Sequence, residues 1–184
     1  FYGTPEGKMD IHSQEELNQI LKTLDGADYQ VSEVRMGERT KKAPLPFTTS
    51  TLQQEASKAL NFSTQKTMRL AQQLYEGVDI KGSGTVGIIT YLRTDSVRIS
   101  DEAQAAARAY ITERFGEAYA AVQEATRKDG KKIQDAHEAI RPTDISRTPE
   151  QIKDSLSRDQ FRLYQLIWKR FAASRMNAAV FETT

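Results

Sequence analysis

Residues 157–175, SRDQFRLYQLIWKRFAASR, carry the strongest apolar stripe in the chain. Ser157 and Gln160 have the spacing of a capping box, which predicts a helix that begins there and runs to about Arg175. One face of this helix is apolar and is formed by Phe161, Tyr164, Ile167, Trp168 and Phe171. Such a face needs other elements to cover it, so the stripe predicts a mainly α domain, with Trp168 as a core anchor.

Further helical patterns supply the partners. They predict helices at 51–60, Thr64–Glu76, Asp101–Phe115 and from Pro149 onward. The first begins with a capping box of Ser50 and Gln53. The residues expected to face the core are Leu52, Ala56, Ala59, Leu60, Met68, Ala71, Leu74, Tyr75, Ala106, Ala107, Tyr110 and Ile111.

Residues 1–44 have a different pattern and predict a small α+β piece. A capping box opens the helix Gln14–Leu24, and the alternation of residues 29–34 predicts a strand. The basic, proline-bearing residues 41–46 are typical of a linker, and residues 180–184 predict another strand. The expected division is 1–44, 45–176 and 177–184.

Composition limits the classes of function. Residues 1–34 hold 2 Lys/Arg against 7 Asp/Glu, whereas the remainder holds 24 against 18. This basic excess is expected for a phosphate-binding surface, although a solvated helical surface would show the same balance. The chain has no cysteine, which excludes disulfides and thiolate metal sites and fits a cytosolic protein. It has no apolar run long enough to span a membrane, and because it starts at Phe1 we expect a piece of a larger polypeptide.

Residues 82–87, GSGTVG, match the pattern G-x-G-x-x-G. The dinucleotide-binding form of this pattern needs a strand before it and a helix after it. Here a predicted helix precedes it and a β-branched run follows, so we reject that interpretation. A Walker loop is also excluded, because Ile88 follows Gly87 where lysine would be needed. We expect a flexible connection.

Residues 88–96, IITYLRTDS, run from β-branched to polar side chains. If this segment is extended, Tyr91 and Arg93 point to the same face. A guanidinium pairs bidentately with phosphate oxygens, and a phenol serves as a covalent nucleophile once its proton is removed or offset. The pair therefore indicates a site that attacks a phosphodiester. The alternative is that Tyr91 is a half-buried packing residue.

Residues 137–143, HEAIRPT, contain a second candidate pair. A zinc helix of the H-E-x-x-H type would need histidine where Arg141 stands, and the chain has no Asp-x-Asp metal motif, so we predict no metal ligands. If the segment is helical up to Ile140, His137 and Arg141 face the same way. Two donor groups on one face suit a phosphate backbone.

These stretches resemble sequence motifs of one family. Residues 89–96, ITYLRTDS, are similar to the active-site tyrosine motif of the type IA DNA topoisomerases. Residues 137–143, 46–53 (PFTTSTLQ) and 74–77 (LYEG) resemble three further motifs of bacterial members, and all stand in the family's order. Leu92 is a mild departure, because methionine is commoner at this position in topoisomerase I and proline in topoisomerase III.

The resemblance implies a fold of four domains around a hole large enough for DNA. This chain would be the helical domain that bears the active-site tyrosine, and its α+β N-terminal piece would belong to the arch of that toroid. The remaining domains of the same polypeptide would be partners, and one of them, an acidic domain absent from this chain, would bind Mg²⁺.

The resemblance also implies the chemistry. Tyr91 would cleave single-stranded DNA through a 5′-phosphotyrosyl intermediate, without ATP, to relax negatively supercoiled duplex DNA. Arg93 would hold the scissile phosphate, and His137 and Arg141 would contact nearby backbone. The protein would work in the cytoplasm at the nucleoid, with no membrane partner. The alternatives are a non-catalytic DNA-binding helical module and a purely structural piece of the arch.

Overall fold

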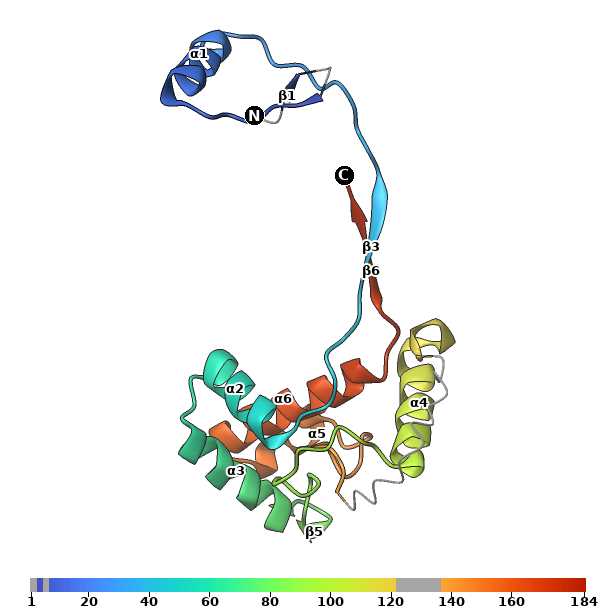
Figure 1. The fold of residues 1–184 in the computed structure, drawn as a ribbon. Helices are drawn as coiled ribbons and strands as arrows, with labels where there is room; N and C mark the ends of the chain where they lie inside the picture. Colours follow the sequence, from blue (N-terminus) through green and yellow to red (C-terminus); the bar gives the residue numbers. More distant parts are fainter. Residues whose placement is uncertain (1–2, 5–6, 122–136) are drawn as a thin grey trace, which may run out of the picture. The chain divides into compact units, whose positions relative to one another are not determined.

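The computed structural model describes residues 3–4, 7–121 and 137–184 (Figure 1). The helices are α1 (Gln14–Leu24), α2 (Thr49–Leu60), α3 (Thr64–Glu76), α4 (Asp101–Phe115), α5 (Pro149–Ile152) and α6 (Arg158–Ser174), with 3-10 turns η1 (Glu117–Tyr119) and η2 (Lys153–Ser155). Within the described residues the strands pair as β1 (Gly3–Thr4) with β2 (Gly7–Lys8), β3 (Gly37–Lys41) with β6 (Ala179–Thr183), and β4 (Val78–Ile80) with β5 (Gly84–Val86). The chain is therefore mainly helical with small sheets, as predicted.

Contacts divide the chain into two units. One comprises Phe1–Gly37 with Glu182–Thr184, and the other comprises Glu38–Phe181. The second unit holds all the candidate site residues. The expected domain limits at residues 44 and 176 stay a prediction.

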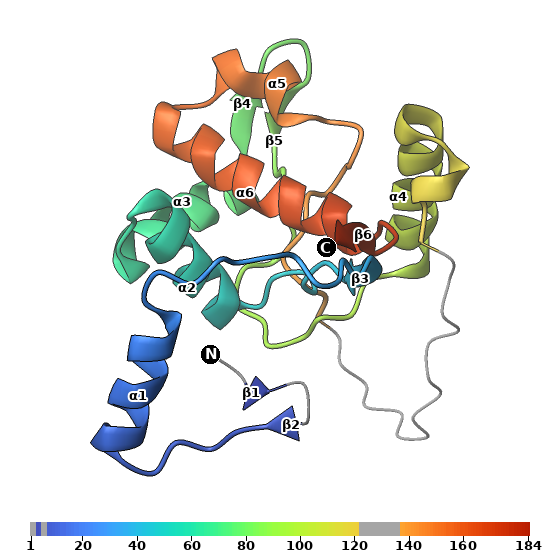
Figure 2. The same cartoon turned by 90° about the horizontal axis from the view of Figure 1, so that it is seen from above.

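Helix α6 runs through the second unit and contacts α2 and α3 (Figure 2). Its predicted stripe is the centre of the core: Tyr164, Ile167 and Phe171 are buried. The polar atoms of its aromatic residues have partners, since the Tyr164 hydroxyl donates to the Arg147 carbonyl (2.7 Å) and Trp168 Nε1 donates to the Ile145 carbonyl (2.9 Å). The stripe thus organises the unit as its pattern predicted.

The helix starts follow their capping residues, with one correction. Ser63, Ser100 and Ser157 each accept a hydrogen bond from a backbone N–H of the first turn. Helix α2, however, does not begin with Ser50 and Gln53. It begins at Thr49, because Thr48 and Thr51 form the reciprocal capping box two residues earlier.

Some residues expected in the core lie outside it. Ala59, Tyr75 and Ala106 are exposed. On α4 the buried positions are Ala103, Ala107 and Ile111, one residue per turn. Ala103 and Ala107 pack in one cluster with Phe171 and Ala172 at the carboxyl end of α6, so only a narrow face of α4 is covered. The expected inward position of Ala106 was therefore wrong.

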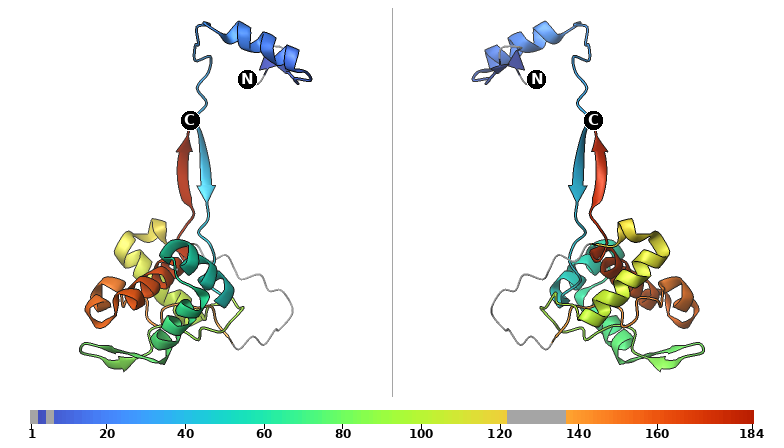
Figure 3. Two further views of the ribbon diagram at one scale, coloured as in Figure 1. Left: turned by 90° about the vertical axis from the view of Figure 1, so that its left-hand side faces the viewer. Right: turned by 90° about the vertical axis from the view of Figure 1, so that its right-hand side faces the viewer.

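The glycine-rich residues form an ordered β-hairpin, not a flexible connection (Figure 3). Strands β4 and β5 pair antiparallel, and Gly82 and Gly84 both have positive φ (83° and 72°), which glycine adopts without strain. The register buries Val78 and Ile80. The hairpin therefore joins α3 to the segment that starts at Ile88.

In the first unit, α1 forms as predicted, with the Ser13 side chain accepting from the Glu16 N–H (3.1 Å). The predicted strand at 29–34 is wrong, because among the described residues no strand pairs with that stretch and its apolar side chains are exposed. The strand predicted near the C-terminus is confirmed as β6. The surface loop expected at 127–135 lies outside the described residues.

Candidate functional site

The segment that carries Tyr91 is not a strand, and the backbone bends at Leu92 and Arg93. Its one bridge pairs Ile89 with Pro142. From residue 91 to residue 96 burial alternates, with Tyr91 and Arg93 exposed and Leu92, Thr94 and Ser96 buried. Tyr91 and Arg93 are thus both exposed, while the common face expected for an extended segment stays a prediction.

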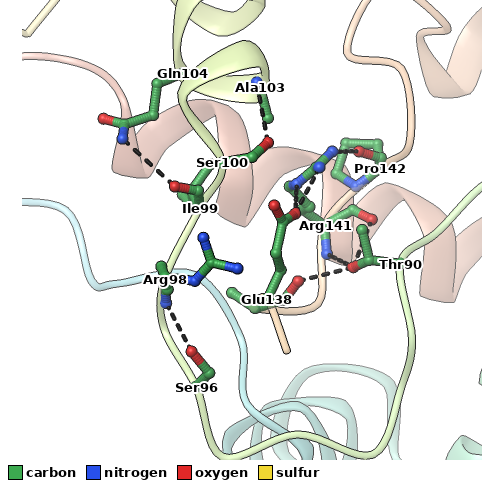
Figure 4. Close-up of polar contacts among 11 residues, drawn as sticks. Thr90, Ser96, Arg98, Ile99, Ser100, Ala103, Gln104, Glu138, Arg141 and Pro142 are labelled. Atoms are coloured by element: carbon green, nitrogen blue, oxygen red, sulfur yellow. Dashed lines mark hydrogen bonds and ion pairs between the residues drawn. The ribbon is translucent and has the colours of Figure 1, made fainter. Parts of the chain in front are cut away.

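Thr90 fastens the backbone just before Tyr91 (Figure 4). Its N–H donates to the Arg141 carbonyl (2.9 Å), and its hydroxyl donates to the Ala139 carbonyl (2.7 Å) while accepting from the Arg141 N–H (2.9 Å). These bonds tie the tyrosine segment to residues 137–143. The position of the Tyr91 Cα is therefore set by contacts about 50 residues away in sequence.

Thr49 fastens the backbone just after Tyr91. Its hydroxyl donates to the Leu92 carbonyl (2.8 Å) and accepts from the Thr94 N–H (2.9 Å), and its own N–H donates to the Thr94 carbonyl (2.9 Å). Thr49 is the first residue of α2, so the amino end of that helix holds the loop. Residues 46–53 therefore act on the site through Thr49.

The carboxyl end of α3 completes the frame. The Ile88 N–H donates to the Leu74 carbonyl (2.8 Å), and a side chain at Gly87 would place its Cβ 2.5 Å from the Tyr75 carbonyl oxygen. Glycine is needed at position 87 for this close approach. All the stretches that resemble family motifs thus meet around residues 88–96.

Tyr91 projects from this frame with 40% of its surface exposed. Its ring contacts Tyr75 edge-on, at a centroid distance of 5.4 Å and an interplanar angle of 67°. It also contacts the His137 ring, at 5.7 Å and 32°. Among the described residues neither the Tyr91 hydroxyl nor the Arg93 guanidinium has a hydrogen-bond or ion-pair partner, so both are open to a ligand.

Arg141 is placed differently from Arg93. Its side chain is 12% exposed and forms an ion pair with Glu138, with Nε and Nη2 at 2.8 and 2.6 Å from the same carboxylate oxygen. Its Nη1 donates to the Pro142 carbonyl (3.0 Å; Figure 4). The guanidinium therefore faces an internal partner.

The pairing also affects the acid. Burial raises the pKa of Glu138, but the hydrogen bonds and charge of Arg141, with help from Ser100, more than offset this and hold the pKa below its ordinary value. Glu138 therefore stays ionised beside Arg141. The ion pair therefore links two residues of the same short segment, Glu138 and Arg141.

The helical arrangement considered for His137 and Arg141 does not form. Residues 137–143 are extended, with bridges from Ile140 to Phe47 and from Pro142 to Ile89. His137 is exposed beside Tyr91, while Arg141 turns toward Glu138. The structure thus brings the rings of Tyr91 and His137 together and pairs the Arg141 guanidinium with Glu138.

Sequence reasoning missed Thr49, Thr90 and Tyr75. The two threonines act through long-range backbone contacts that no local pattern signals. Tyr75 was counted as a core residue because its spacing on α3 fits the apolar stripe. The signal that could have identified Tyr75 is its place in residues 74–77, a stretch that resembles a family motif.

The described residues offer neither a metal-ligand cluster nor a membrane-spanning helix. Among the described residues no three His, Cys, Asp or Glu side chains gather closely enough to hold a metal ion. No helix in the described part of the chain combines the length and apolar character that crossing a membrane requires.

Comparisons with known proteins agree on one family. A family model described as DNA topoisomerase matches residues 4–184. The crystal structure of full-length topoisomerase I from Thermotoga maritima, in a monoclinic form, has a TM-score of 0.75 and 44% identity over 97% of this chain. The chain spans 27% of the length of that protein. Because the family model covers nearly the whole chain and the structural match is close, the chain belongs to the type IA family of DNA topoisomerases.

Proposed function

We propose that this chain carries the DNA-cleaving centre of a type IA topoisomerase, with Tyr91 as the nucleophile. The observation that carries the proposal is the setting of Tyr91: its phenol is exposed and unpaired among the described residues, while Thr90 and Leu92 on either side are fixed by hydrogen bonds. A fixed backbone and a free hydroxyl suit a nucleophile that must meet a substrate. A packing tyrosine would be buried, as Tyr164 is.

The proposed reaction conserves phosphodiester bonds. The Tyr91 phenol gives up its proton and its oxygen forms a bond to phosphorus, the bond from phosphorus to the 3′ oxygen breaks, and the leaving oxygen takes up a proton to become a 3′-hydroxyl, so no net proton is gained or lost. The 5′ end stays attached to tyrosine. Because the bond energy is kept in this link, the reverse attack by the 3′-hydroxyl reseals the strand without ATP.

Arg93 is proposed to hold the scissile phosphate. It stands two residues after Tyr91 on the exposed side of the segment, and its guanidinium can pair with two phosphate oxygens as negative charge develops on them. His137, whose ring touches Tyr91, is proposed to contact the backbone nearby. The expected backbone contact of Arg141 stays a prediction, and its ion pair favours a positioning role instead.

Other requirements fall to the rest of the polypeptide. A phenol has a pKa of about 10, and no residue described here is an evident base for it. We place activation of the tyrosine and Mg²⁺ binding in the acidic domain expected elsewhere in the polypeptide. The described residues do not form a metal site, and the proposed bond exchange at phosphorus involves only the tyrosine and the DNA strand.

The proposed substrates are single-stranded DNA and negatively supercoiled duplex DNA, and the proposed location is the cytoplasm at the nucleoid. The modest basic excess after residue 34 is also compatible with the alternative, a DNA-binding helical module without catalysis. The two functions differ in one product. Only the first leaves protein covalently joined to DNA.

The test uses the full-length protein and a single-stranded oligonucleotide labelled at one end, incubated with Mg²⁺ and then denatured. A 5′-phosphotyrosyl link predicts that a 3′-end label travels with the protein, whereas a 5′-end label is released on a shorter strand. Tyr91→Phe, which removes only the hydroxyl, should abolish the adduct and leave the melting temperature unchanged.

Tyr110→Phe is the matched control, because Tyr110 lies on α4 against Trp168, away from residues 88–96. It should form the adduct normally. An adduct of normal yield in Tyr91→Phe would exclude Tyr91 as the nucleophile. A wild-type protein that binds the oligonucleotide but never forms an adduct would favour the non-catalytic module.

A further inference from the structure

We propose that Tyr75 is a positioning residue for Tyr91: the contact between the two rings holds the Tyr91 phenol in the orientation needed for attack on phosphorus. The inference rests on the proposed function of Tyr91. It assigns a functional role to a residue of the stretch Leu74–Gly77, which also contacts residues 87–88 through the backbone carbonyls of Leu74 and Tyr75.

Tyr75 does not belong to the core. The buried residues of α3 are Thr67, Leu70, Ala71 and Leu74. Tyr75, next along the helix, is 39% exposed, and its hydroxyl has no partner among the described residues. Tyr164 shows the contrasting case, since it is fully buried and its hydroxyl is hydrogen-bonded. An exposed ring without a hydrogen bond contributes little to packing.

The two tyrosines emerge from backbone segments that are fixed to each other. The hydrogen bond from the Ile88 N–H to the Leu74 carbonyl is 2.8 Å long, and the Tyr75 carbonyl lies against Gly87. Since Thr90 is fixed as well, little freedom remains in the backbone between the rings. Their contact therefore depends on side-chain torsions rather than on loop motion.

The geometry of the contact is a favourable one. A centroid distance of 5.4 Å and an angle of 67° correspond to an edge-to-face pair, in which the positive ring edge meets the negative face. Tyr91 has two side-chain torsions and is itself 40% exposed, so its ring contacts with Tyr75 and His137 restrict where the phenol points. In-line attack needs the oxygen aligned with phosphorus, and misalignment slows the step.

A different role for Tyr75 would be to stack a base of single-stranded DNA. The two roles predict different kinetics. A stacking platform contributes to DNA affinity, whereas a positioning residue changes the rate of adduct formation from bound DNA and leaves affinity unchanged.

The experiment compares Tyr75→Ala, Tyr75→Phe and Tyr119→Ala in the full-length protein. Tyr119 is a matched control, because it is also exposed and also pairs with an aromatic ring, Phe115, outside the site. Adduct formation is followed in single turnover with saturating oligonucleotide and Mg²⁺. The cleaved fragment is chosen short enough to dissociate, so that resealing does not obscure the rate. Affinity for the oligonucleotide is measured with each variant in the Tyr91→Phe background.

We expect Tyr75→Ala to slow adduct formation by about two- to tenfold, the range that one aromatic pair allows. Its oligonucleotide affinity and melting temperature should match wild type. Tyr75→Phe keeps the ring and should restore the rate, and Tyr119→Ala should have no effect on it.

An unchanged rate in Tyr75→Ala would overturn the inference, and so would a loss of affinity that accounts for the whole effect. A Tyr75→Phe variant as slow as Tyr75→Ala would also overturn it, because the hydroxyl would then be the active group. None of these outcomes touches the role of Tyr91. That role fails only if Tyr91→Phe still forms the adduct.

Discussion

Residues 88–96 and 137–143 are joined by a bridge and by backbone hydrogen bonds, yet they place their arginines in opposite settings. Arg93 is exposed and has no ion-pair partner among the described residues. Arg141 is nearly buried, and its guanidinium forms an ion pair with Glu138 and donates a hydrogen bond to the Pro142 carbonyl. Both were expected to contact phosphate, because both stand in stretches that resemble motifs of a DNA-cleaving family.

The difference shows that two arginines in stretches with the same family resemblance can have different internal partners. A guanidinium that is to bind substrate must be left without an internal partner, as Arg93 is. A guanidinium paired within the fold has its donors occupied and instead fixes the segment that carries it. The comparison therefore supports the proposed contact of Arg93 with the scissile phosphate and favours a positioning role for Arg141.

Replacing Arg93 should give the largest effect. Arg93→Lys keeps the positive charge but loses the two-pronged guanidinium, and we expect a loss of about 10²–10³-fold in the rate of adduct formation, by analogy with the removal of one donor to a developing anion. The melting temperature should not change, because Arg93 has no partner among the described residues. Wild-type cleavage by Arg93→Lys would show that the residue is only a surface charge.

Replacing Arg141 should act on stability instead. Arg141→Ala leaves the carboxylate of Glu138, 17% exposed, without its ion-pair partner. We expect a loss of about 3 kcal/mol in the free energy of unfolding, at the low end for broken buried pairs. Denaturant unfolding measures it. The double variant Arg141→Met with Glu138→Gln removes both charges and should lose less. An equally large loss in Arg93→Lys would erase the contrast between the two arginines.

The helices were more predictable than the segments that form the site. The apolar stripe of α6 and the serines at positions 100 and 157 are local signals, and these helices form where the signals predict them. The start predicted for α2 from Ser50 was wrong, because Thr48 offers the same capping chemistry two residues earlier. The strand predicted from the alternation of apolar and polar residues at 29–34 was wrong, because a strand also needs a pairing partner, which no local pattern supplies.

The site depends on contacts that sequence spacing does not carry. The sequence predicted that Tyr91 and Arg93 share a face if their segment is extended, but it did not predict that both are exposed. The inward turn of Arg141 follows from Glu138 and from the extended course of residues 137–143, which the bridges to Phe47 and Ile89 impose. Those partners are far away in sequence, so local periodicity gave no warning of them.

Thr90→Val tests how far the two segments depend on each other. The change keeps the shape but removes a hydroxyl that donates to the Ala139 carbonyl and accepts from the Arg141 N–H. Leaving these groups unpaired should cost about 1–3 kcal/mol of unfolding free energy, measured by denaturant titration. Thr143→Val is the control, since Thr143 is exposed and water can replace its bond to the Gly87 carbonyl. Equal losses in both variants would contradict the special role of Thr90.

The smallest expected effect is the pH dependence that Glu138 gives to stability. Its pKa in the folded protein is lower than its ordinary value, so the stabilisation is complete above the unfolded pKa of about 4.3 and is lost as the pH falls through the folded pKa. The gap in unfolding free energy between wild type and Glu138→Gln should therefore narrow as the pH is lowered from about 6 to about 3.

The Arg141→Met background sharpens this test of the ion pair. Burial raises the pKa of Glu138, and without Arg141 only the hydrogen bonds from Ser100 oppose it. In that background, the difference in unfolding free energy between the variants with Glu138 and with Glu138→Gln should change little as the pH falls. The reason is that the fold no longer favours the ionised carboxylate. Unfolding curves at a series of pH values in the two backgrounds give the comparison directly. If the narrowing were as large without Arg141 as with it, the ion pair would not be what holds residues 137–143 in place, and the assignment of Arg141 as a positioning residue would fail with it.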